Sequence, residues 1–321
     1  MTIDLQELRR SLADPWALDD KSLATLGAAA EELGALARRA YVDGNEAARR
    51  EAEAILYYIN IDNCFAPPLH GVAAVAWTTL MRTKLGAIKK QLGGCEPIDV
   101  PEMSRRLKAA VEQWGAYNHP VLKTIADLAP YRIWAKNWFG SCVGFSAQLA
   151  ALVQRTAASA KQVVLENLSD EFDHKVTHDT LRIRFYESLG LTFSAAAALD
   201  DADRVLEATE LLNLRTGLSF LRDPVWALGC FFGVEANWPP ECRLHLEINR
   251  ARGTDEHTLE YWTNHAFADE SHSAEWLTAL EGTCKTPRDC ANAVDGCVMQ
   301  LRMRWQMYDA IARRIAPAKG G

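Results

Sequence analysis

The stretch NHAFADESH (264–272) decides our interpretation of the fold, because it holds three residues of metal-ligating type at helical spacing. On an α-helix that advances about 100° per residue, Asp269 lies about 40° and His272 about 20° from His265 around the axis. We therefore predict that these three side chains project from one stripe of a helix over 254–283. The alternative is a polar face meeting solvent, or core histidines paired with the aspartate.

The segment ENLSDEFDHKVTHDTL, which begins at Glu166, carries a second group of potential ligands. Glu171, His174 and His178 stand at positions i, i+3 and i+7 and would share one face of a helix predicted over 160–190. Glu166 would point about 140° away from that face. The alternative is an exposed, charge-rich helix with ordinary i,i+3 pairs.

The segment ALGCFFGVEANWPP places a lone acid, Glu235, in an apolar helix predicted over 222–250. A buried carboxylate without a partner is costly, so a metal or another cation should neutralise it. A salt bridge to Lys or Arg, or a turn that brings Glu235 to water, would also serve. Together the three segments supply carboxylates and imidazoles but no thiolate, a mixture that suits iron or manganese better than a structural zinc site.

Helix-favouring composition runs along the whole chain of 321 residues, with apolar residues recurring three and four positions apart. We expect an all-α fold with almost no strand. The predicted helices cover 21–43, 45–59, 70–92, 102–116, 131–159, 160–190, 203–219, 222–250, 254–283 and 288–315. We place an N-terminal helical extension at 1–112 and a second domain at 113–321.

Charge and hydropathy exclude several classes of partner. The net charge of -7 leaves no basic face for nucleic acid and no polybasic membrane patch. The N-terminal residues lack the apolar core of a secretory signal, and no apolar run approaches the roughly 20 residues of a membrane span. We expect a cytoplasmic protein that acts on a small molecule, with its eight scattered cysteines reduced.

Read in order, the motifs NHPVL near 118, NLSDEF followed by HDTL, ALGCFFGVE, and H-x3-D-x2-H resemble those of the heme-oxygenase-like diiron oxidases. The resemblance covers about residues 115–315 and implies a heme-oxygenase-like seven-helix bundle carrying the N-terminal helical extension. It implies two ferrous ions with O2 as co-substrate, and manganese is the alternative metal. The implied ligands are Glu171, His178, Glu235, His265, Asp269 and His272.

One departure from the family bears on the reaction. Members that oxygenate an amine nitrogen resemble one another in a seventh, carboxylate ligand about one helix upstream, but 130–165 contains no Asp or Glu. Glu166 is the nearest substitute, and its helical angle turns it away. We therefore expect C–H activation of a small amino acid or fatty acid, by desaturation, C–C cleavage or cyclisation. N-oxygenation of an amine is the alternative.

Further alternatives remain open. Glu171-x-x-His174 matches ferritin-like diiron bundles but leaves His178 unexplained, so we expect His174 to orient a ligand. Arg182 and Arg184 are candidates to bind a substrate carboxylate, or are simply salt-bridged. A metal-free helical binding protein is the alternative of another class. The aromatic segment LYYINIDNCFAPPLHG suggests packing against the core or a second subunit, which would make a homodimer.

Overall fold

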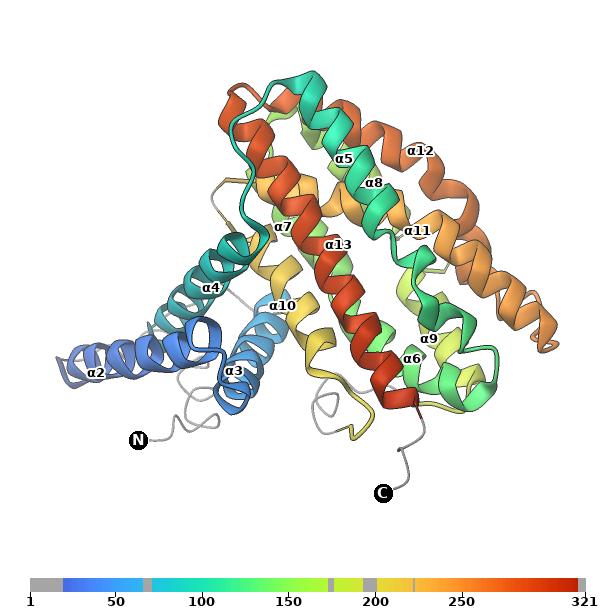
Figure 1. The fold of residues 1–321 in the computed structure, drawn as a ribbon, viewed down its shortest axis with the longest axis horizontal. Coiled ribbons are helices and arrows are strands. Elements are labelled where there is room, and N and C mark those ends of the chain that lie inside the picture. The colour runs from blue at the N-terminus through green and yellow to red at the C-terminus, as the bar shows by residue number, and fades with distance from the viewer. Residues whose placement is uncertain (1–19, 66–70, 173–175, 193–200, 222, 317–321) are drawn as a thin grey trace. The chain divides into compact units, whose positions relative to one another are not determined.

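The computed structural model is helical throughout its described part (Figure 1). It describes the residue ranges 20–65, 71–172, 176–192, 201–221 and 223–316. Within these ranges, the side chains at 20–27, 62–65, 71–72 and 268–271 lie outside the description. No strand occurs in the described ranges, so the predicted all-α fold class is confirmed. None of the described helices is both long and apolar enough to cross a membrane.

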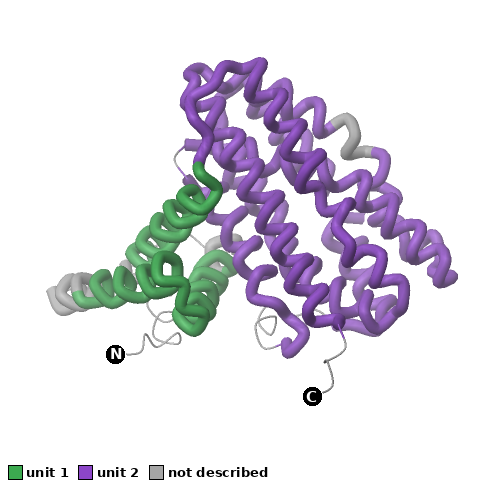
Figure 2. The backbone as a smooth tube through the Cα atoms, in the orientation of Figure 1, with its two compact units in different colours: residues 1–93 green, residues 94–321 purple. Residues whose placement is uncertain are grey.

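Two compact units divide the chain between Gly93 and Gly94 (Figure 2). The first unit contains α2 (Asp20–Ala37), the π-helix η1 (Arg38–Val42), α3 (Glu46–Phe65) and α4 (Gly71–Leu92). Its core is built from small and branched apolar side chains such as Leu33 and Leu56. Inside it, Lys84 Nζ lies 2.7 Å from Oε1 of Glu53, and both side chains are buried.

The second unit begins with α5 (Val100–Trp114), which packs against the last helix, α13 (Pro287–Ile315). Because of that packing, the division of the chain precedes α5, whereas we had placed the boundary between residues 112 and 113. The elements between them are η2 (Ala116–Asn118), η3 (Pro120–Lys123), α6 (Leu128–Ser141), α7 (Phe145–Arg155), α8 (Ala158–Asp170), α9 (His178–Ser188), α10 (Leu206–Ser219), α11 (Val225–Ala251) and α12 (Glu260–Thr283).

Two of the predicted helices are each broken into two, which corrects the sequence interpretation. The helix predicted over 131–159 divides into α6 and α7 at Gly144, whose φ of 71° lies in the left-handed region that favours glycine. The helix predicted over 160–190 ends at Asp170, and α9 begins at His178. Thr177 caps the new start, since its side chain accepts a hydrogen bond from the backbone N–H of Thr180.

The long helices α11 and α13 pack closely against each other, and glycines allow the approach. A Cβ atom added at Gly229 would lie 1.9 Å from the backbone oxygen of Ala293, and one added at Gly296 would lie 2.1 Å from that of Trp226. Side chains are therefore excluded at both crossing points. The partner helix α12 also packs along α11, so α11 lies between two long neighbours in the second unit.

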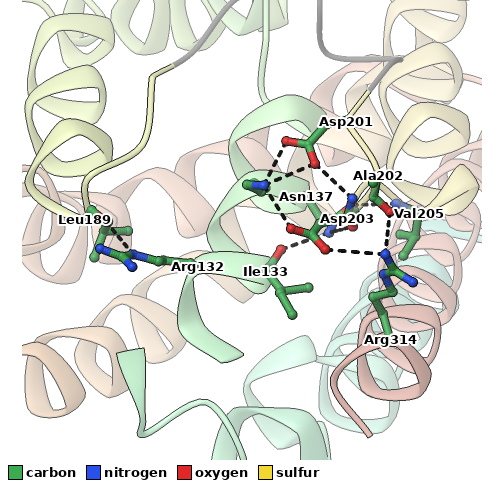
Figure 3. Close-up of polar contacts among 10 residues, drawn as sticks. Arg132, Ile133, Asn137, Leu189, Asp201, Ala202, Asp203, Val205 and Arg314 are labelled. Carbon is green, nitrogen blue, oxygen red and sulfur yellow. Dashed lines mark hydrogen bonds and ion pairs between the residues drawn. The ribbon is translucent and has the colours of Figure 1, made fainter. Parts of the chain in front are cut away.

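The residues just before α10 are anchored by polar contacts to α6 and α13 (Figure 3). Asn137 is fully buried in α6; its Nδ2 donates to the backbone oxygen of Asp203 at 2.9 Å, and its Oδ1 accepts from Val205 N at 2.7 Å. Arg314 of α13 donates to the backbone oxygen of Ala202 at 2.8 Å. These bonds fix the chain where it enters α10.

Stacked indoles fill the core of the second unit next to the site described below. Trp134 and Trp138 of α6 stack with ring centroids 5.4 Å apart, and Trp138 stacks on Trp238 of α11 at 5.7 Å. Trp262 of α12 lies 4.9 Å from Trp138. All four rings are buried, so they hold α6, α11 and α12 together through a large apolar contact.

Candidate metal centre

Three predicted ligands meet where α8, α9 and α12 converge. One potential ligand atom from each of Glu171, His178 and His265 lies within 4.8 Å of the other two. His178 Nδ1 is 3.3 Å from Oε1 of Glu171, and the two imidazole rings are 4.5 Å apart. The structure therefore brings half of the predicted six-residue set into one cluster.

Glu171 and His178 meet by a different route from the one we predicted. They do not share a helical face, because Glu171 caps the C-terminus of α8 and His178 is the first residue of α9. The two residues are held together by their backbones, because the N–H of His178 donates to the oxygen of Glu171 at 3.1 Å. His174, which we expected to orient a ligand, lies outside the described residues.

The imidazole of His265 is held in one orientation. Its Nδ1 lies 2.8 Å from the backbone oxygen of Tyr261, one helical turn earlier in α12. Since a carbonyl oxygen only accepts, Nδ1 carries the proton and Nε2 keeps its lone pair. This is the arrangement in which metal-binding histidines are usually found, with one nitrogen donating and the other free to bind the ion.

A second group of predicted ligands lies on α11 and α12. His272 Nδ1 is 3.7 Å from Oε2 of Glu235, which is only 5% exposed. On its other side, His272 Nε2 is 2.8 Å from Oδ2 of Asp170, the last residue of α8. The backbone of α12 includes Asp269, but its side chain lies outside the described residues.

Asn167 holds the carboxylate of Glu235 in place. With its amide oriented to satisfy both neighbours, the Asn167 nitrogen donates to Oε1 of Glu235 at 3.2 Å, and its oxygen accepts from Nε1 of Trp276 at 3.0 Å. Asn167 and Trp276 are both buried. The carboxylate therefore has fixed partners, as a metal ligand needs.

Both groups line a single cavity of about 580 Å³, a volume that includes solvent at its mouth. Among the lining residues are Glu171, His178, Glu235, His265 and His272. The cavity wall also includes aromatic and apolar side chains and three arginines. These are Phe145, Val234, Trp238, Tyr261, Arg182, Arg215 and Arg304.

Glu166, which we named as an alternative ligand, does not reach this cavity. It is exposed on α8, and its Oε1 accepts a hydrogen bond from Gln162 at 2.7 Å. The helical angle explains the outcome, because Glu166 is more than one turn from Glu171 and faces away from it. Arg184, a candidate for carboxylate binding, also lies outside the cavity wall and pairs with Glu260 at 2.9 Å.

Four contributors to the cavity escaped the sequence interpretation. Asp170 was visible as the first residue of the D-E pair, but the predicted unbroken helix turned it away from the ligand face. Asn167 lies in the segment that carries Glu171, but only its carboxylates and histidines were considered as ligands, and Arg304 lies in a helix whose polar residues gave no ligand spacing. Arg215 lies in α10, where every described residue from Ala208 to Ser219 is buried, so no amphipathic pattern indicates the cavity side.

The electrostatics of the cluster favour an ionised carboxylate. Burial alone would raise the pKa of Glu171, but the hydrogen bond and charge of His178, together with His265 and Arg182, hold it below its ordinary value. Two nitrogen donors and a carboxylate then face one volume. Atoms that bind one metal ion at about 2.1 Å lie at most about 4 Å from one another. The three ligand atoms here lie within 4.8 Å of one another, so a small movement of the side chains would let them bind a single ion.

Known proteins similar to this chain share its fold. A family model described as "iron-containing redox enzyme" matches residues 132–305. The comparison with curated proteins found no match. Among solved structures, a domain of unknown function with a heme oxygenase-like fold from Shewanella denitrificans is 16% identical. It covers 68% of this chain and 94% of its own, with a TM-score of 0.54.

Two further solved structures have the same relation to the chain. A CADD-like protein of unknown function from Nostoc punctiforme is 16% identical, covers 67% of this chain and 97% of its own, and has a TM-score of 0.54. A TenA homolog from Pseudomonas syringae pv. tomato is 13% identical, covers 65% of this chain and 92% of its own, and has a TM-score of 0.55. These matches confirm the heme-oxygenase-like fold expected from the motifs.

Proposed function

Because the chain belongs to the family of iron-containing redox enzymes, we propose that it is a non-heme diiron oxidase. In this proposal it uses dioxygen to oxidise a C–H bond of a small carboxylate-bearing metabolite, such as an amino acid or fatty acid. The family match spans most of the second unit and includes every predicted ligand. Membership supports iron and redox chemistry, while the number of irons, the oxidant and the substrate belong to the proposal.

The observation that carries the proposal is the presence of two donor groups in one cavity. Glu171, His178 and His265 would hold one iron. Glu235 and His272 would hold the other, together with Asp269, which lies in α12 as His272 does. Carboxylate and imidazole donors suit ferrous iron, and this number of ligands leaves open positions on two ions. When bound, iron supplies the electrons and the open positions that dioxygen activation requires.

The chain's own residues prepare this cavity for the reaction. Tyr261 fixes His265 through its carbonyl oxygen, and Asn167 fixes Glu235 through its amide. Trp238 and Val234 add apolar wall next to the ligands, which limits the access of water to the reacting volume. An oxidase needs such a wall because water competes with the substrate for the open positions.

A second candidate function is N-oxygenation of an amine by the same centre. Sequence alone counted against it, because no acid occurs in 130–165. The position of Asp170 favours N-oxygenation, since its carboxylate lies next to His272 and supplies an additional acid at the cavity. Mass spectrometry of the products separates the two: oxygen gained on nitrogen indicates N-oxygenation, and loss of two hydrogens or of a carbon fragment indicates C–H chemistry.

The test of the proposed function begins with iron. Metal-free protein would be titrated anaerobically with Fe(II), its iron counted, and the loaded protein mixed with O2 while absorbance and O2 consumption are followed. We expect about two irons per chain, and O2 consumption that a carboxylate substrate accelerates. His265→Ala should lose iron, while Glu166→Ala, a change on the exposed face of α8, should retain it. No iron in the wild type would overturn the proposal and favour a metal-free binding protein.

A further inference from the structure

The cavity at the candidate metal centre contains a buried cation, Arg215 of α10. Its side chain is 1% exposed and lines the cavity. One Nη donates to the backbone oxygen of Ser141, and the guanidinium carbon lies 5.9 Å from the ring centroid of Phe145. Its Nε has no hydrogen-bond partner among the described residues. No described carboxylate lies within ion-pair distance of it, so no acid in the described part of the chain offsets its charge directly.

The other two arginines of the cavity differ from Arg215 in this respect. Arg182 pairs with Asp179, and Arg304 lies 2.9 Å from Oε2 of the buried Glu241. A buried charge is costly unless an opposite charge and hydrogen bonds offset it. Among the three, Arg215 alone has no described carboxylate within ion-pair distance, and its hydrogen bond goes to the neutral backbone oxygen of Ser141.

The electrostatic environment of Arg215 also favours the binding of an anion. Burial lowers the pKa of Arg215, and the charge of nearby Arg304 lowers it further, although a guanidinium remains protonated at neutral pH. Two ferrous ions would bring four positive charges, and the three carboxylates proposed as ligands, Glu171, Glu235 and Asp269, would leave one of these charges without a counterpart. An anion entering the cavity would therefore be attracted by Arg215 and by the metal centre together.

We propose that Arg215 binds the carboxylate of an organic acid whose apolar part lies along Phe145, Val234 and Trp238. The planar guanidinium matches a carboxylate through two parallel hydrogen bonds, which no Lys or His can reproduce. The apolar wall favours an organic acid over a small inorganic anion. The inference rests on the proposed function in one respect, because it takes the cavity with the metal ligands as the substrate site.

The first test compares three probes of equal chain length on the wild-type protein. Isothermal titration calorimetry would measure decanoate, decan-1-ol and decylamine, with the protein metal-free and then loaded anaerobically with Fe(II). We expect decanoate to bind at least about tenfold more tightly than either of the others. Equal or tighter binding of decan-1-ol or decylamine overturns the inference, and so does inorganic phosphate that binds where decanoate does not.

The second test assigns the effect to one residue. Arg215→Met keeps the length of the side chain but removes its charge, and it should lose the preference for decanoate over decan-1-ol. Arg215→Lys should retain part of it, since the charge remains without the paired donors. Arg184→Met, outside the cavity, should behave like wild type. Arg182→Met tests whether Arg182 binds the carboxylate instead. If Arg182→Met loses the preference for decanoate and Arg215→Met retains it, the assignment to Arg215 is overturned.

Two further readouts keep the outcomes distinct. Far-UV circular dichroism establishes that each variant is folded, and the wild-type comparison of probes decides the inference if Arg215→Met is not. Iron counting separates this inference from the proposed function. Iron binding without a decanoate preference overturns the role of Arg215 alone, whereas an Arg215-dependent preference without iron binding overturns the diiron proposal alone.

Discussion

Asp170 Oδ2 lies 2.8 Å from Nε2 of His272 and thereby joins the end of α8 to the middle of α12. A carboxylate that accepts from one nitrogen of a metal-binding histidine orients the ring and strengthens its other nitrogen as a ligand. We predict that Asp170→Asn lowers the affinity for Fe(II) about tenfold. Anaerobic titration would measure it, with Ser169→Ala in the same exposed turn as control. Unchanged affinity would show that Asp170 has no part in metal binding.

The crossing of α11 and α13 gives a second prediction. Gly229→Ala should lower the free energy of unfolding by about 1–3 kcal/mol or more, because the new Cβ would meet the backbone oxygen of Ala293. Gly86→Ala in α4 is the matched control, since nothing lies within 4 Å of a Cβ there. That change should stabilise by up to about 1 kcal/mol through helix propensity. Urea unfolding measures both, and equal effects would contradict the close approach.

The buried ion pair of Arg304 and Glu241 gives a third prediction. Burial alone would raise the pKa of Glu241, but Arg304, His245 and Tyr308 lower it to about 2, so the carboxylate is ionised at neutral pH. Arg304→Met should therefore destabilise the protein by about 3–5 kcal/mol, because it leaves that charge unpaired.

Adding Glu241→Leu to Arg304→Met supplies the control for this pair. The double variant should recover much of the lost free energy of unfolding, since no buried charge is left without a partner. Double-mutant unfolding curves measure the coupling between the two positions. A double variant less stable than Arg304→Met would contradict the explanation.

His119 gives a prediction about pH. Its Nδ1 accepts from the backbone N–H of Val121 at 3.1 Å, so its Nε2 carries the proton and donates to Asp309. Burial lowers the pKa of His119 below its ordinary 6.5, although Asp309 acts in the opposite direction. As the pH falls, His119 is therefore protonated at a higher pH in the unfolded chain than in the folded protein. The free energy of unfolding should fall as the pH drops below about 6.5.

His119→Asn isolates that contribution. An asparagine oxygen can still accept from Val121, but the side chain no longer titrates. Denaturant unfolding at a series of pH values between about 7 and 5 should show a shallower loss of stability for the variant. His245, whose pKa burial also lowers, is present in both proteins and cancels in the comparison. A steeper loss in the variant would mean that folding raises the pKa of His119, which would contradict the effect of burial.

The sequence predicted the helical content and the meeting of three candidate ligands, Glu171, His178 and His265, better than it predicted the local breaks. The stripe of His265 and His272 followed from the helical repeat alone, because α12 is unbroken across it. The separation of Glu171 and His178 onto two helices did not, since the polar sequence around them resembles that of a charged helix surface. Arg215 could not be found, because a helix buried on all sides has no polar face to mark its cavity side.

The candidate donors come from four helices that meet only when the second unit is folded, from Glu171 at the end of α8 to His272 in α12. An unfolded chain cannot gather them, so metal would bind the native state alone. By mass action, a ligand at 100 times its dissociation constant adds about 2.7 kcal/mol to the stability of the state it binds. Iron supply would then set how long this protein survives in the cell as well as whether it can turn over.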